Sequence, residues 1–114
     1  MSQNRNKLIE LFIGNLANSV LHGVLEKAIK DKELSKRYTK ELLNSFNLAQ
    51  KYREKINPVD TPLLLSDTVY IKDKIIRKVH AELRLRTARG YENLDASIVK
   101  GFVENSLKEL KVVD

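Results

Sequence analysis

The hydrophobic residues of the first third of the chain recur in adjacent pairs every four positions. This spacing is typical of an α-helix and not of the alternation of a strand. Because each four-residue step advances the stripe by ~40° around a helix, the apolar arc widens to about half of the circumference. The pattern predicts a central helix over residues 8–29, with Asn4 or Asn6 as its N-cap. The pairs are Leu8 and Ile9, Phe12 and Ile13, Leu16 and Ala17, Val20 and Leu21, Val24 and Leu25, and Ala28 and Ile29.

The opposite side of this helix carries small residues, Gly14 and Gly23, with Asn18 and Ser19 between them. A glycine inside a helix costs about 1 kcal/mol relative to alanine. The two glycines therefore indicate either a neighbouring backbone that comes close or a kink, and we favour close packing.

A second helix is predicted from apolar residues that recur three or four apart. Asp31 or Ser35 is its candidate N-cap, and the sequence Asn57-Pro58 ends it, because the residue before a proline avoids the helical conformation. The charged stretch before it, residues 30–33, holds no glycine or proline, so a single long helix is the alternative to a turn. The apolar positions are Leu34, Tyr38, Leu42, Phe46, Ala49, Tyr52 and Ile56.

The segment after this break contains three consecutive leucines. Thr61 and Pro62 have the pattern of an N-cap followed by proline in the first helical position, which predicts a short helical turn through residues 63–65. The leucines either cover the end of the core or form a surface patch for a partner.

Two further helices are predicted in the second half of the chain. Ser66, Asp67 or Thr68 is expected to cap the third helix, which runs to about Ala88 or Arg89 before Gly90. Its expected core residues are Val69, Ile75, Ile76, Val79 and Leu83. Asn93 or Asp95 is expected to cap the fourth helix, whose core face would comprise Leu94, Ile98, Val99, Phe102, Val103, Leu107 and Leu110.

Four amphipathic segments with short connections predict an all-α protein, a four-helix bundle-like single domain over residues 1–114 with up-down topology. The wide apolar arc of the first helix offers more apolar surface than three neighbouring helices can cover, so we expect a homodimer to complete the bundle.

Composition narrows the range of functions. The chain has 42% hydrophobic and 32% charged residues, which is too apolar for a disordered protein. It has no cysteine and only two histidines, so thiolate chemistry is excluded and a metal centre is poorly supplied. We find no P-loop, dinucleotide-binding or hydrolase motif. Without such a motif, nothing in the sequence indicates an enzyme, and we expect no cofactor and no enzyme activity. Polar residues interrupt the most apolar stretch, so we expect no membrane partner and a cytoplasmic location.

The charge distribution points weakly to nucleic acid. The net charge is +6, and residues 72–89 hold seven basic residues against two acidic ones. On a helical wheel Lys74, Arg77, Lys78 and Arg84 lie together opposite the core positions, with Tyr70 among them. Such a stripe can neutralise the phosphates of DNA or RNA without reading their sequence. The alternatives are an ordinary solvated surface and a contact for an acidic protein.

A polar strip on the first helix is the second candidate site. Asn18, His22 and Glu26 are four apart, so a histidine lies one turn from a carboxylate, an arrangement that suits acid–base chemistry or two metal ligands. A surface histidine paired with Glu26 is the interpretation we favour. The sequence thus predicts a basic helical module that binds nucleic acid. The alternative is a protein–protein adaptor that uses the first helix and the three leucines.

Overall fold

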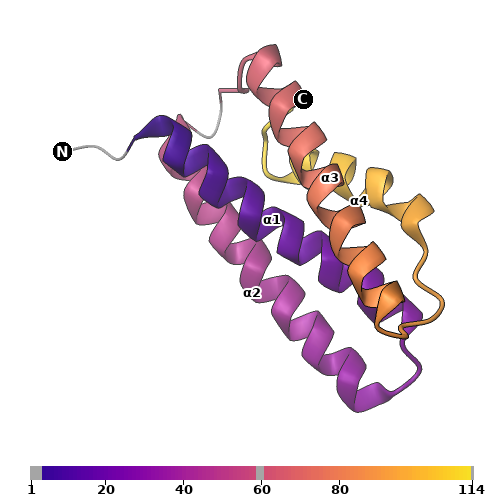
Figure 1. Cartoon of the computed structure of the whole chain (residues 1–114). Helices are drawn as coiled ribbons and strands as arrows, with labels where there is room; N and C mark the ends of the chain where they lie inside the picture. The colour runs from indigo at the N-terminus through magenta and orange to yellow at the C-terminus, as the bar shows by residue number, and fades with distance from the viewer. Residues whose placement is uncertain (1–3, 59–60, 114) are drawn as a thin grey trace.

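The computed structural model describes residues 4–58 and 61–113, and 81% of them are helical. They form α1 (Arg5–Ala28), α2 (Lys32–Ile56), α3 (Leu65–Ala88), a 3₁₀ turn η1 (Ala96–Ile98) and α4 (Val99–Glu109), with no strand among them. The chain reverses direction at each connection, so the helices follow one another up and down along the 43 Å length of the molecule (Figure 1). The predicted all-α, bundle-like fold with up-down topology is confirmed.

Helix α1 is the central element, as predicted. It lies between α2 on one side and α3 and α4 on the other (Figure 1), and Asn4 caps it by accepting a hydrogen bond from the Asn6 amide. Its apolar arc is buried by these three helices within one chain. The exposed arc from which we expected a homodimer is therefore not present, and the oligomeric state stays a prediction.

Helix α1 is long and apolar enough, by length and composition, to cross a membrane. Its most apolar window of 18 residues has a mean hydropathy of 1.4, although the sequence pattern had indicated no such stretch. In the folded chain 67% of that window is buried inside the protein. This burial is what the core helix of a soluble bundle requires.

A turn separates α1 from α2, so the alternative of one long helix is wrong. Ile29 is extended, and the Asp31 carboxylate caps α2 by accepting from the amides of Glu33 and Leu34. The predicted end at Ile56, before Asn57, is confirmed. The buried residues of α2 are Ser45, Ala49 and Arg53, of which only Ala49 belongs to the predicted apolar pattern. Four of the large residues in that pattern are partly buried against the core: Tyr38, Phe46, Tyr52 and Ile56.

The connection between α2 and α3 differs from the prediction. Residues 61–64 are not helical, because the backbone at Leu64 is extended and α3 begins only at Leu65. The Leu63 amide donates to the Val112 carbonyl (3.3 Å), and its side chain covers the end of the core. Leu64 and Leu65 are 70% and 78% exposed. Leu63 therefore covers the end of the core, whereas a partner for Leu64 and Leu65 stays a prediction.

The start and the core face of α3 also required correction. Ser66, Asp67 and Thr68 lie inside the first turn and none of them caps it. Asp67 instead pairs with Arg5 of α1 at 2.6 Å. Val69 is 59% exposed, so its predicted place in the core is wrong. The buried residues recur every four positions, a little more than one helical turn: Ile71, Ile75, Val79 and Leu83.

Helix α4 closes the bundle. Asp95, one of its two predicted caps, accepts from the Ser97 amide at the start of η1, which continues into α4. The chain turns back at Lys111, where φ is +60°, and this turn buries Val112. Atoms of Leu42 and of the Phe102 ring would lie 3.2 Å from a Cβ at Gly23, so the close packing inferred at that glycine is confirmed.

Candidate nucleic-acid interface

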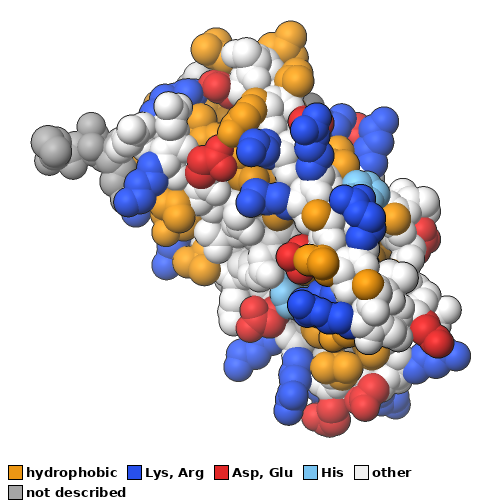
Figure 2. All heavy atoms as spheres, viewed as in Figure 1, with side chains coloured by type: hydrophobic (Ala, Val, Ile, Leu, Met, Phe, Trp, Pro, Cys, Tyr) orange, Lys and Arg blue, Asp and Glu red, His pale blue; other side chains and the backbone are white. Residues whose placement is uncertain are grey.

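The cationic side chains predicted on the third helix form its outer surface. Arg77, Lys78 and Arg84 are exposed and Lys74 is half-buried; we call these four residues the basic face. They project from the helix that buries Ile71 and its partners on the other side, so the bundle core holds their positions. Figure 2 shows several lysine and arginine side chains gathered along α3, with hydrophobic and a few acidic side chains among them.

The structure brings four of the five predicted residues close together. Tyr70, Lys74, Arg77 and Lys78 line one shallow depression on the outer side of α3, whereas Arg84 lines another one nearer the loop before α4. The Lys74 ammonium lies 5.7 Å from the centre of the Tyr70 ring, which is 44% exposed. A cation against an aromatic face is the type of surface on which a nucleobase can stack.

Carboxylates compensate only part of this charge. Arg77 pairs with Asp73 at 3.0 Å, but both side chains are exposed, and such a pair contributes less than about 1 kcal/mol. In the part of the chain that the structure describes, Lys74, Lys78 and Arg84 form no ion pair. These three cations are therefore free to meet an external anion.

Two neighbouring groups are held by partners on other helices. Lys72 does not belong to the basic face, because its ammonium binds Glu104 of α4 at 2.9 Å. This contact lowers the pKa of the Glu104 carboxyl. The Tyr70 hydroxyl donates to the Glu10 carboxylate of α1, which raises the pKa of Tyr70. Tyr70 therefore stays neutral and is anchored to α1, so the phenol adds no negative charge to the face.

The polar strip of α1 is used to pack against α2. The Asn18 amide donates to the Ser45 hydroxyl at 2.5 Å. His22 donates from Nδ1 to the Asn18 carbonyl at 2.8 Å, and its ring meets the Tyr38 ring edge-on at 5.8 Å. Glu26 makes no hydrogen bond or ion pair with any described residue, and residues 4–58 and 61–113 contain no cluster of three metal-ligating side chains. The geometry gives Asn18 and His22 a structural role.

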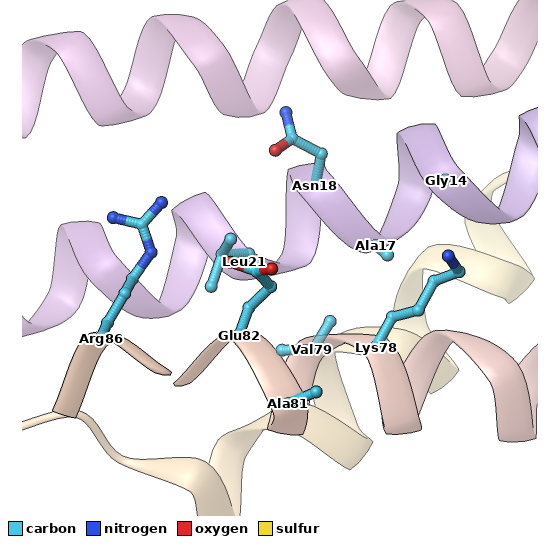
Figure 3. Close-up of a pocket in the computed structure, with 9 residues that line it drawn as sticks. All are labelled: Gly14, Ala17, Asn18, Leu21, Lys78, Val79, Ala81, Glu82 and Arg86. Carbon is cyan, nitrogen blue, oxygen red and sulfur yellow. The ribbon is translucent and has the colours of Figure 1, made fainter. Parts of the chain in front are cut away.

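A groove between α1 and α3 was not foreseen from the sequence. It has a volume of about 430 Å³, and Figure 3 shows side chains of both helices around it. The α1 side is formed by Gly14, Ala17, Asn18 and Leu21, and the α3 side by Lys78, Val79, Ala81, Glu82 and Arg86. Lys78 joins this groove to the basic face. The wheel could not place Glu82 and Arg86 here, because their position depends on how α3 crosses α1.

Comparisons of the chain with protein-family models, with curated proteins and with solved structures give no match. Its function must therefore be inferred from the geometry of its own residues.

Proposed function

We propose that the protein is a small non-enzymatic module that binds nucleic acid through the basic face of α3, without reading the base sequence. The observation that carries this proposal is the set of cations Lys74, Lys78 and Arg84, which have no carboxylate partner among the described residues and stand on one rigid helix. Each cation that meets a phosphate releases a condensed counterion, which favours binding.

Arg77 adds to this surface despite its pairing with Asp73. An exposed ion pair between residues one turn apart stabilises a helix by only about 0.3–0.5 kcal/mol, so a phosphate can replace the carboxylate at little cost. Arginine can also hold a phosphate with two parallel hydrogen bonds. We expect a dissociation constant in the micromolar range or weaker, with a strong dependence on salt.

The test is the double charge reversal Arg77→Glu with Arg84→Glu. Both side chains are exposed, so the melting temperature should change little, while binding to a labelled oligonucleotide should collapse. Fluorescence anisotropy at about 50 mM salt, where phosphate contacts are strongest, measures the affinity. The slope of log affinity against log salt should fall by about 0.9 for each phosphate contact that is lost.

The matched control is Lys36→Glu with Lys40→Glu on the exposed side of α2. It changes the net charge by the same amount but leaves α3 intact. If both double variants lose affinity equally, only the net charge matters and the basic face is not the site. If the unmodified protein retards neither DNA nor RNA at low salt, the proposal is wrong.

A second candidate function, a protein–protein adaptor, is supported by a different observation. The end of the molecule at the start of α3 exposes Leu64, Leu65 and Val69, whereas the apolar arc of α1 is buried. The expected homodimer would use this patch. Light scattering of the unmodified protein and of Leu65→Lys tests it, because a charge in the patch should shift any dimer to monomer. If the unmodified protein is monomeric at micromolar concentration, the homodimer is excluded.

A further inference from the structure

Gly14 forms part of the α1 wall of the groove between α1 and α3. A Cβ built at Gly14 would meet no atom within 4 Å, in contrast to Gly23, where neighbouring side chains come close. The packing explanation that we expected for both glycines is therefore wrong for Gly14. A helical glycine that no neighbour requires costs about 1 kcal/mol and leaves an open space in return.

The walls of this space combine an apolar floor with polar groups at its edge. Ala17, Leu21 and Val79 are buried below it, while Lys78 and Glu82 extend from α3 toward α1 (Figure 3). A volume of about 430 Å³ lies in the range of sites that hold small organic groups. Glu82 forms no ion pair with the described residues, so its carboxylate can accept hydrogen bonds from a ligand amino group.

The charges around the groove select the class of ligand. Lys78 belongs both to the groove and to the basic face, so a phosphate on that face is directly next to the groove. Arg86 stands two turns further along the same wall and provides a second cation. A nucleobase within a polynucleotide fits these features. Its flat ring can lie on the apolar floor, its amino substituents can donate to Glu82, and the phosphates on either side can meet the cations.

We propose that the groove binds an unpaired nucleobase, and that the protein therefore prefers single-stranded to double-stranded nucleic acid. This inference rests on the proposed function. In a duplex the bases are stacked and paired, so that only the phosphates reach the protein, whereas a single strand can turn a base into the groove. Phosphates on either side would contact Lys74, Arg77 and Lys78, and the exposed Tyr70 ring offers a stacking surface for a neighbouring base.

The test compares Gly14→Leu with Gly101→Leu. Both glycines are exposed in a helix, and a Cβ at either position meets nothing within 4 Å, but only Gly14 lines the groove. Leucine at position 14 adds a bulky side chain to the α1 wall of the groove and leaves every charge in place. The affinities for a labelled single-stranded DNA, the same sequence as RNA, and the matching duplex are measured by anisotropy. Gly14→Met with Gly101→Met, which adds an unbranched side chain that suits a helix, serves as a second pair if a leucine variant does not fold.

We expect the unmodified protein to bind at least one single strand about tenfold more tightly than the duplex, as burial of one base against the apolar floor would provide. Gly14→Leu should lose this preference and keep its duplex affinity, whereas Gly101→Leu should keep both. Equal affinities of the unmodified protein for single strands and duplex overturn the inference but leave the proposed function standing. A Gly14→Leu variant that retains the preference also overturns it. Failure to bind any of the three overturns the proposed function itself.

Discussion

Replacing Arg53 should cost the fold a large part of its stability. This arginine is only 1% exposed, although no carboxylate pairs with it in the part of the chain that the structure describes. Its guanidinium donates to the Thr61 carbonyl at 2.9 Å and to the Lys111 carbonyl at 2.8 Å, and it also binds Asn57. One side chain thus ties together the end of α2, the connection to α3 and the turn after α4.

The magnitude follows from these contacts. A hydrogen bond from a charged donor contributes about 1.5–3 kcal/mol, and removing the donor also leaves buried carbonyls without partners. Burying the cation itself costs several kcal/mol, and removing Arg53 also removes this cost, which opposes the loss. With the hydrogen bonds to Asn57, Thr61 and Lys111 lost and the cost of burying the cation recovered, we expect a net loss of about 3–5 kcal/mol, out of the 5–15 kcal/mol that typically stabilises a domain. At roughly 4 °C per kcal/mol, Arg53→Ala should lower the melting temperature by about 12–20 °C.

Two further variants separate the hydrogen bonds from packing. Arg53→Met keeps a long apolar side chain but has no donor, so it should lose most of the same stability. Arg53→Lys keeps the charge but cannot reproduce the planar fork of donors, and we expect an intermediate loss. Burial lowers the pKa of the Arg53 guanidinium, yet it stays protonated near neutral pH, so the cost should not vary there with pH. Urea denaturation measures these differences. An Arg53→Met variant within about 0.5 kcal/mol of the unmodified protein would refute the reasoning.

Four other variants test single features of the fold. Because Lys72 lowers the pKa of Glu104 in the folded state, their contact should stabilise the protein at neutral pH and lose this effect as the pH falls through the folded-state pKa. Glu104→Gln should thus melt below the unmodified protein at about pH 7, and the difference should shrink steadily as the solution is made more acidic. Gly14→Ala should raise the free energy of unfolding by about 0.5–1 kcal/mol, whereas Gly90→Ala should lower it by about 1 kcal/mol, because Gly90 has a φ of +102°. Opposite signs in urea denaturation confirm this pair of predictions, and equal signs contradict it. Val24→Asp places an unpaired charge in the core and should abolish the cooperative melting seen by circular dichroism; a folded, helical variant would show that α1 is not central.

Local rules were sufficient for the helices themselves. The four-residue spacing of apolar pairs defines α1, the carboxylates of Asp31 and Asp95 start the elements after them, and Asn57-Pro58 ends α2. Each of these features depends on residues within one or two turns, so the chain needs no tertiary contact to encode them. The outward direction of Arg77 and Lys78 also follows from helical geometry alone.

What the sequence did not determine depends on residues distant along the chain. Arg53 is buried because the Lys111 carbonyl, 58 positions away, comes within hydrogen-bond distance of it. Val69 is exposed because α3 packs on the bundle through the face that carries Ile71 and Ile75, and Val69 points away from that face. A Cβ at Gly14 would meet open space, whereas a Cβ at Gly23 would meet Leu42 and Phe102, although both glycines belong to one helix. The side-chain periodicity of a helix is fixed locally, but its crossing of other helices is set by packing, and that crossing decides which positions become core, surface or groove.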